Sequence, residues 1–464
     1  MQAGSLTKKN PFVIAKLPII IVTAIAFAVG TSILGFSLTS ARAAHVAGNG
    51  RLVRWGSQSS GSQSSGSQSS GSQFSGARPW GSADIPTGNQ KGYSVAVSGK
   101  TAVVATPGLA NDAGAAYIYE QAAKSSSWHL AATLHDPRKV AHDEYAWAVA
   151  ISSTKAGTYV AIGGNDTNGR RDLVYIYQGS GRSWHLQATI ADIGKTSQDM
   201  FGDAIAISGQ VLVVGASCVN QNIGDTYVLV RFGSVWRLQA HFPDPTPGQR
   251  ESFGQSVSIS GYTVLVGSNN AAYVYSRGAG NHWAKTATIA NPSAANDLFG
   301  LSVALSGKMA IVGAPEDIQG EGATYVFTLS GKKWVRRQKL TTFPGVFGGE
   351  FGWSVALTGS ELAIGMPIFG TVTCGTALVF RESGGKWVPQ VQMKNPKCTQ
   401  GDKFGFSVAA TGTAGVFGAP YTNKNQGAAY LLPLSKGTKP AAAARSARHQ
   451  SARYQSARYQ SARY

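Results

Sequence analysis

The chain has 464 residues, enough for one large β domain with extensions at both ends, and its formal net charge is +19. Residues 1–90 hold seven Lys/Arg and one Asp, and residues 433–464 hold seven Lys/Arg and no acid, which leaves only +6 for the middle of the chain. This distribution argues against a basic nucleic-acid-binding domain, so we expect no nucleic-acid partner.

The N-terminus has the pattern of a targeting segment. Three lysines within residues 1–16 precede an uncharged apolar stretch at 17–38, and Ala41-Arg42-Ala43 resembles a cleavage site. The apolar stretch is also long enough to cross a bilayer. A cleaved signal peptide and a membrane anchor both remain open for residues 1–44, and either would place the rest of the chain outside the cytoplasm, secreted or at the cell surface.

Two low-complexity segments flank the middle of the chain. Residues 45–72 are predicted to be a linker, because Gly-Ser-Gln-Ser-Ser repeats over Gly56–Ser75, a composition typical of a flexible spacer. Residues 435–464 end in three copies of Gln-Ser-Ala-Arg-Tyr, a basic tail with few aliphatic residues that we expect to be disordered. One interpretation of these tails is association with a membrane or an anionic cell-wall polymer, and the other is a repeat expansion without a partner.

Residues 73–434 contain seven copies of one motif. The copy that begins at Phe299-Gly300 continues through Val312-Gly313-Ala314-Pro315 and Tyr325-Val326-Phe327 to Trp334. Short runs of β-branched and aromatic residues bounded by Gly, Pro or Ser are typical of strands and turns. The copies begin at residues 91, 145, 201, 253, 299, 351 and 404.

A repeat of about 50 residues that holds four strands is typical of a propeller blade. The sequence therefore predicts an all-β fold, a seven-bladed β-propeller of four-stranded antiparallel blades, with disordered basic N- and C-terminal tails. The seventh copy has no Trp strand of its own. We predict that Phe74–Trp80, or alternatively Leu52–Trp55, supplies the missing strand, because an unpaired sheet edge is a liability.

The Phe-Gly and Gly-Ala-Pro signatures resemble the FG-GAP repeat family, which includes the propeller head of integrin α subunits and many bacterial extracellular repeat proteins. The resemblance covers roughly Asn89–Leu432. Several integrin blades carry an Asp/Asn-rich calcium loop between the first and second strands, whereas this chain has tight Ser-Gly turns there, such as Ser306-Gly307. The chain thus resembles the short-turn bacterial subtype, and we expect no calcium, no other metal and no cofactor.

The residue after each Phe-Gly is aromatic in four blades that are consecutive in a closed ring. These residues are Trp353, Phe406, Tyr93 and Trp147. They are predicted to form an arc on the face where the fourth-to-first loops emerge, the face that integrin heads use for ligand. The arc is either a ligand-binding surface, since aromatic side chains supply large, rigid contacts, or ordinary packing between blades.

The three cysteines are distributed so that one pair is favoured. Cys374 is predicted to lie in the second-to-third connection of blade six, and Cys398 in the loop that leads to blade seven. Both connections emerge on the same face, and an exported protein meets an oxidising environment, so we predict a disulfide between them. Cys218 is left unpaired.

No recognisable catalytic motif is present. Glu316, Asp317 and Glu321 are the densest acidic group in a blade loop, and we expect them to be solvated. We therefore expect a non-enzymatic interaction or adhesion module that presents its loops to an extracellular protein or glycan. The alternative is a propeller enzyme, a glycosidase or lyase acting on a surface polymer.

Overall fold

The computed structural model describes residues 90–434, apart from 109–112, 123–126, 140–143, 165–171, 195–198, 220–222, 247–250, 294–295, 343–348 and 369–373. The predicted targeting segment, linker and C-terminal tail lie outside these residues. So do both segments that we expected to complete blade seven.

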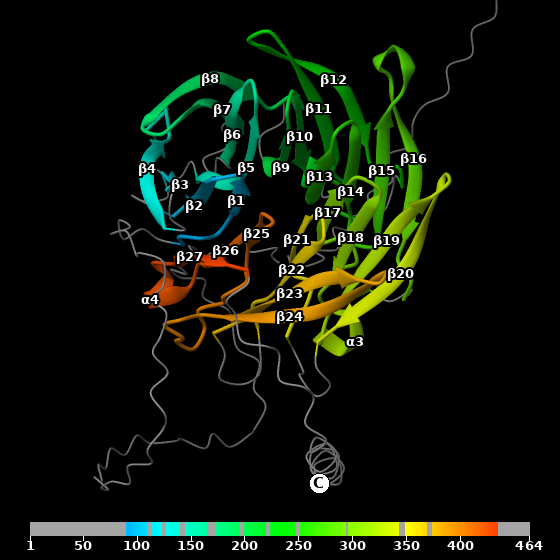
Figure 1. Ribbon diagram of the computed structural model, residues 1–464. Coiled ribbons are helices and arrows are strands. Elements are labelled where there is room, and N and C mark those ends of the chain that lie inside the picture. Colours follow the sequence, from blue (N-terminus) through cyan, green and yellow to red (C-terminus); the bar gives the residue numbers. More distant parts are fainter. Residues whose placement is uncertain are drawn as a thin grey trace, which may run out of the picture. The chain divides into compact units, whose positions relative to one another are not determined.

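The described residues form seven antiparallel sheets arranged around a common centre (Figure 1), which confirms the seven-bladed β-propeller. Six sheets have four strands, and the described part of blade seven has three. Helix in these ranges is confined to short segments in the connections, such as α3 (Asp317–Gly320), α4 (Thr422–Asn425) and the 3-10 turn η1 (Ala279–Asn281).

Each blade is a meander whose strands pair in chain order. Blades one to three comprise β1 (Val95–Ser98), β2 (Thr101–Thr106), β3 (Ala115–Gln121), β4 (Trp128–His135); β5 (Tyr145–Thr154), β6 (Gly157–Gly164), β7 (Leu173–Ser180), β8 (Ser183–Ala191); and β9 (Phe201–Ser208), β10 (Val211–Ala216), β11 (Asp225–Phe232), β12 (Val235–Pro243). Blades four to seven comprise β13 (Ser256–Ser260), β14 (Thr263–Gly267), β15 (Ala271–Arg277), β16 (Trp283–Ala290); β17 (Ser302–Ser306), β18 (Met309–Ala314), β19 (Ala323–Ser330), β20 (Lys333–Thr341); β21 (Ser354–Thr358), β22 (Glu361–Met366), β23 (Thr376–Ser383), β24 (Lys386–Lys394); and β25 (Val408–Ala410), β26 (Ala414–Ala419), β27 (Ala428–Pro433).

Burial changes systematically across a blade. In blade five, β18 is buried along nearly its whole length because neighbouring blades cover both of its faces, whereas β20 is exposed at most positions. A β-bulge between Val326 and Phe327 interrupts the pairing of β19 with β20, and each other four-stranded blade has a bulge at the same place. Such bulges increase the local twist, which turns the outer strand relative to the inner ones.

The Phe-Gly motif forms a tight turn at the start of each blade. In blade five, Leu301 N donates to Leu298 O at 2.9 Å, and Phe299 between them is fully buried. Gly300 sits third in this turn with φ 106°, a conformation that a type II turn requires at that position and that favours glycine. Blade two has Ala146 at the equivalent place with φ 70°, so its degenerate motif keeps the turn at some conformational cost.

Glycines also allow adjacent blades to approach closely. A Cβ on Gly313 of blade five would lie 2.1 Å from the carbonyl oxygen of Gly352 in blade six. The same carbonyl accepts a hydrogen bond from Ser302 Oγ at 2.7 Å. The Phe-Gly-x-Ser and Gly-Ala-Pro motifs are therefore the two halves of one contact between neighbouring blades.

The ring closes between blades seven and one through the same contact. Ser407 Oγ donates to Gly92 O at 2.8 Å, although 315 positions separate these residues in the chain. Gln90 N donates to Asn425 O at 2.6 Å, and one apolar cluster combines buried residues of both blades, including Val104 and Val416. Closure within the described residues thus depends on the inner strands.

Candidate functional site

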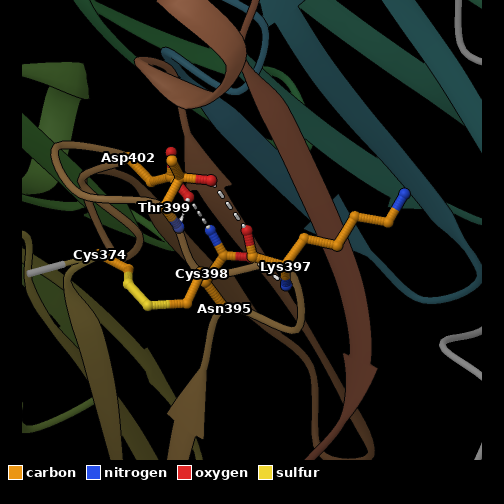
Figure 2. The surroundings of a disulfide bond; sticks show 6 residues. All are labelled: Cys374, Asn395, Lys397, Cys398, Thr399 and Asp402. Atoms are coloured by element: carbon orange, nitrogen blue, oxygen red, sulfur yellow. Dashed lines mark hydrogen bonds between the residues drawn. A yellow bond between two sulfur atoms is a disulfide. The ribbon is translucent and has the colours of Figure 1, made fainter. Parts of the chain in front are cut away.

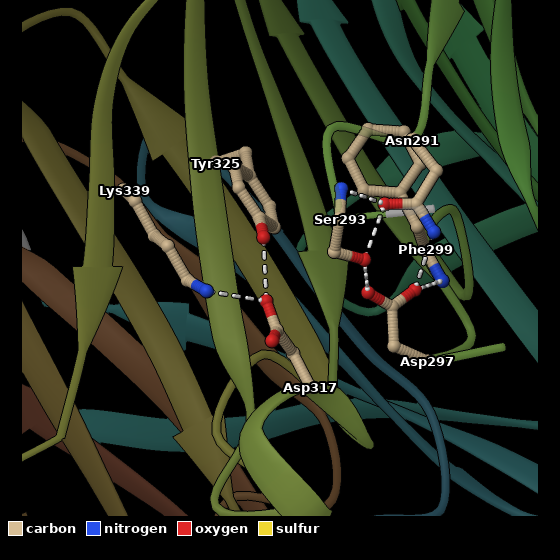
Figure 3. Close-up of polar contacts among 7 residues, drawn as sticks. All are labelled: Asn291, Ser293, Asp297, Phe299, Asp317, Tyr325 and Lys339. Carbon is tan, nitrogen blue, oxygen red and sulfur yellow. Dashed lines mark hydrogen bonds and ion pairs between the residues drawn. The ribbon is translucent and has the colours of Figure 1, made fainter. Parts of the chain in front are cut away.

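The propeller has two different faces. We call the face that carries the second-to-third and fourth-to-first connections the loop face, and the face that carries the first-to-second and third-to-fourth hairpins the turn face. Buried acidic side chains on the loop face accept hydrogen bonds that hold the longer loops in place. In Figure 3, Asp297 accepts hydrogen bonds from Asn291 Nδ2 at 2.8 Å and from Phe299 N at 3.1 Å, which ties the loop before blade five to its Phe-Gly turn.

The four predicted aromatic residues do lie together on the loop face, at the start of the innermost strands. The ring centroid of Tyr93 is 4.6 Å from that of Trp147 and 5.1 Å from that of Phe406, and Phe406 is 5.5 Å from Trp353. We call this group the aromatic arc. Its two central members, Tyr93 and Phe406, are 8% exposed, whereas both tryptophans are half-buried. The arc thus combines inter-blade packing in its centre with accessible indole rings at its ends.

The remaining three positions of this inner ring are not aromatic. Leu301 is buried, Gln255 Nε2 donates to Asn269 Oδ1 at 2.9 Å, and the carboxylate of Asp203 accepts from Ser217 Oγ. Burial raises the pKa of Asp203 to about 7, because the charged form loses its hydration. Burial also raises the pKa of the Tyr93 phenol well above its ordinary value, with nearby Tyr421 adding to the effect, so this phenol stays neutral.

A separate cavity of about 300 Å³ lies on the loop face of blade three. Its polar lining consists of Asp199, Asp225, Tyr227 and His241. His241 Nε2 lies 2.9 Å from Asp225 Oδ2, and the imidazole stacks on Tyr227 with ring centroids 4.8 Å apart. Asp199 is 5% exposed, and its Oδ2 has no hydrogen-bond partner among the described residues. The cavity therefore offers carboxylate acceptors to a ligand that brings hydroxyl or ammonium donors.

Blade five shows the same position filled by the protein itself. Lys339 pairs with Tyr325 in the register in which His241 pairs with Tyr227. Its Nζ lies 2.8 Å from Asp317 Oδ2 and 5.3 Å from the Tyr325 ring centroid, and the Tyr325 hydroxyl donates to Asp317 at 2.5 Å (Figure 3). Our expectation that Asp317 is solvated was wrong, because Lys339 on the outer strand covers this carboxylate and leaves it 7% exposed.

The predicted cysteine pair is joined by a disulfide in the structure, with Cα atoms 5.3 Å apart, a normal separation for a disulfide (Figure 2). Cys398 lies in the loop between β24 and β25, and Asp402 braces that loop by accepting from Asn395 Nδ2 at 2.7 Å and from Thr399 N at 2.8 Å. Burial raises the pKa of Asp402. Cys218 is a free, half-buried thiol.

The described ranges contain no group of three or more His, Cys, Asp or Glu side chains that could hold a metal ion. They also contain no helix long and apolar enough to span a membrane, and the apolar stretch at 17–38 lies outside them. Asp172 is 1% exposed and accepts a hydrogen bond from Phe201 N at 3.1 Å. Its role in the structure is to hold the Phe-Gly turn of blade three.

Sequence reasoning did not single out the polar residues of the blade-three cavity. Asp199 lies two residues before a Phe-Gly motif, Asp225 begins a third strand, and His241 lies near the end of a fourth strand. One feature of the sequence could have indicated Asp199. Acidic residues recur just before the Phe-Gly motifs, and the loops that carry them share one face of the propeller. The pairing of Tyr227 with His241 depends on a bulge that the sequence does not mark.

A scan against known families matches the FG-GAP repeat at residues 184–229 and 283–327. Each match begins at the Trp of a fourth strand and ends in the third strand of the following blade. The sequence repeat is therefore offset by one strand from the structural blade. No curated protein matches the chain.

Proposed function

The chain is a β-propeller that carries FG-GAP repeats, a fold that supports an interaction module, and on this premise we propose that it acts outside the cytoplasm as a non-enzymatic adhesion module. Its ligand is a protein or glycan bound on the loop face. The typical extracellular setting of FG-GAP repeats and the targeting pattern of residues 1–44 support the location.

The aromatic arc carries this proposal. Ordinary core packing explains Tyr93 and Phe406, which are nearly inaccessible, but leaves the accessible surface of Trp147 and Trp353 without a structural use. An indole ring held against a buried aromatic neighbour is a rigid platform, because packing has already fixed its rotamer. Such platforms stack on sugar rings and on apolar protein side chains at little entropic cost.

The test replaces both accessible rings, as Trp147→Ala with Trp353→Ala, in the full chain. A glycan array and an extract of surface proteins first identify a ligand for the wild type, and its affinity is then measured for the variant. We expect binding to weaken at least about tenfold, because hot-spot aromatics each contribute about 2 kcal/mol, while the melting temperature changes by only a few degrees.

A matched variant separates binding from stability. Trp184 and Trp334 are also half-buried, but they lie on outer strands away from the arc. Their joint replacement by Ala should leave ligand affinity unchanged. If the arc variant loses many degrees of melting temperature and keeps its ligand, the arc is core packing and the proposed site is wrong.

The blade-three cavity favours the second candidate, a glycosidase or lyase. Two buried carboxylates beside a tyrosine and a histidine are groups that acid–base chemistry on a polysaccharide uses. The same glycan screen distinguishes the two functions, since an enzyme would release new reducing ends from a bound polymer and Asp199→Asn would abolish that release. A binding module would leave every polymer intact.

A further inference from the structure

The described acidic residues are concentrated on one face of the propeller. Among the described acids, only Glu120, Glu361 and Glu382 lie at the turn-face ends of their strands. Two of these carboxylates already have partners within the protein. Glu120 accepts a hydrogen bond from Gly181 N at 2.7 Å, and Glu361 Oε1 forms an ion pair with Arg381 Nη2 at 2.5 Å. The other described acids lie at the loop-face ends of strands or in the connections there.

The turn face is correspondingly basic. Its hairpin turns, and the residues directly beside them, present exposed cationic side chains on four blades: Lys100, Lys155, Arg182, Lys308, Lys332, Lys333 and Lys386. Three of the seven belong to blade five alone. Exposed cations spaced around one face attract an extended anionic surface.

Exposed apolar side chains occur on the same face. Phe232 and Val235 flank the hairpin turn between β11 and β12 and are 50% and 51% exposed, and Tyr262 in the turn between β13 and β14 is 53% exposed. These are the most exposed large hydrophobic side chains in the described part of the chain. An arginine lies over each of the two aromatic rings. The Arg237 Cζ is 6.0 Å from the Phe232 ring centroid, and the Arg277 Cζ is 4.7 Å from the Tyr262 ring centroid.

We propose that the turn face of blades three to five docks on an anionic lipid bilayer, with Phe232, Val235 and Tyr262 entering the headgroup region. Aromatic side chains favour this region, and each nearby Lys or Arg gains about 1 kcal/mol at an anionic surface. A soluble polyanion would use the cations alone, whereas a half-exposed Phe and Val on a hairpin tip gain free energy where an apolar phase lies beneath. The loop face would then point away from the membrane, whatever ligand it binds.

Binding of the full chain to vesicles does not test this surface, because residues 17–38 are apolar and the C-terminal tail is basic. A site-specific label does. Ser234 lies exposed in the β11–β12 turn, so Ser234→Cys in a Cys218→Ala background accepts an environment-sensitive fluorophore at the proposed contact. The equivalent label at Lys424→Cys reports on the loop face.

Vesicles of phosphatidylcholine, with and without phosphatidylglycerol, are then titrated into each labelled protein. We expect a blue shift and a rise in emission at position 234 with the anionic vesicles only, and no change at position 424. Replacing Lys332 and Lys333 by Glu should raise the lipid concentration needed for the half-maximal response at least about tenfold, since two attractive charges of about 1 kcal/mol each are reversed.

A matched control changes the net charge by the same amount as the replacement of Lys332 and Lys333, but on the other face. Lys394 and Lys424 are exposed on the loop face, and replacing both by Glu should leave the response at position 234 unchanged. No response at position 234, an equal response at both labels, or equal loss in both charge variants would overturn the proposal. The same emission change with dextran sulfate in place of vesicles would assign the face to a soluble polyanion instead.

Discussion

The seam between blades five and six and the seam between blades seven and one share an inner half but differ in their outer half. Both have a serine hydroxyl that donates to a glycine carbonyl of the next blade, Ser302 to Gly352 and Ser407 to Gly92. In the outer half of the first seam, the Gln338 side chain donates to Trp387 O at 3.0 Å and accepts from Trp387 N at 2.8 Å.

The seam between blades seven and one has no equivalent pair of outer-strand hydrogen bonds among the described residues, because the described part of blade seven ends with its third strand. It contains instead a buried lysine, Lys91, which is 3% exposed and lies 4.6 Å from the Tyr117 ring. Within the described residues, the two ends of the ring meet through contacts of the inner strands and the loops beside them.

The largest expected effect comes from removing the close approach that both seams share. A Cβ on Gly418 would lie 1.9 Å from Gly92 O, and one on Gly313 would lie 2.1 Å from Gly352 O. Because backbone atoms must move in either case, we expect Gly418→Ala and Gly313→Ala each to lower the free energy of unfolding by about 2–3 kcal/mol. Urea unfolding measures both.

Gly412 provides the control, because a Cβ there would meet nothing within 4 Å. We expect Gly412→Ala to change the free energy of unfolding by less than about 1 kcal/mol. If Gly418→Ala is as mild as Gly412→Ala while Gly313→Ala is not, the two seams differ in their inner half as well, and the comparison fails.

A smaller effect is expected for the seam between blades seven and one, where Lys91 should make the free energy of unfolding depend on pH. Burial lowers the pKa of its amine from 10.5 to about 7, so the folded protein holds this proton less tightly than the unfolded chain does. Between these two pH values the unfolded state binds more protons, and stability should therefore rise with pH across this window. We expect Lys91→Met to remove that slope and to stabilise the protein by about 2 kcal/mol near neutral pH.

Unfolding free energies at about pH 7 and about pH 10, for the wild type and Lys91→Met, check this expectation. Lys100→Met, at an exposed position on the next turn, should leave the slope unchanged. A Lys91→Met protein that is less stable than the wild type would show that the amine stabilises the seam instead.

The smallest effect compares the two serine contacts directly. Ser407→Ala and Ser302→Ala should each cost about 1 kcal/mol, the usual net value of a partly buried hydrogen bond. Similar losses in urea unfolding would show that the closing seam is as well formed as an internal one. A loss for Ser302→Ala without a loss for Ser407→Ala would mean that Gly92 O finds another donor when the ring closes.

The fold could be predicted from the sequence because the motif residues have backbone roles. Gly300 is required by a turn and Gly313 by a close approach, so both recur wherever the blade recurs. The neighbourhood of the aromatic arc was predictable for the same reason, since ring order alone brings Trp353 next to Phe406. The different burial of its four members was not, because it depends on how the side chains pack around the centre.

Contacts made by residues that do not recur from blade to blade could not be predicted from the sequence. Lys339 covers Asp317 in blade five, whereas His241 occupies the matching register position in blade three and lines the cavity there. Each involves an outer strand whose register is shifted by a bulge. Periodicity predicts which face a strand presents to a neighbour, but it does not predict which side chains reach across it.

The described acids are concentrated on the loop face, and few of them lie beside the exposed cations of the turn face, which gives this part of the propeller an electric dipole along its axis. In the field above a negatively charged surface such a dipole experiences a torque, which rotates the molecule before any contact forms. That field decays over roughly 8 Å at physiological ionic strength. Salt should therefore slow productive encounters by randomising the approach, even where the contacts finally made are unchanged.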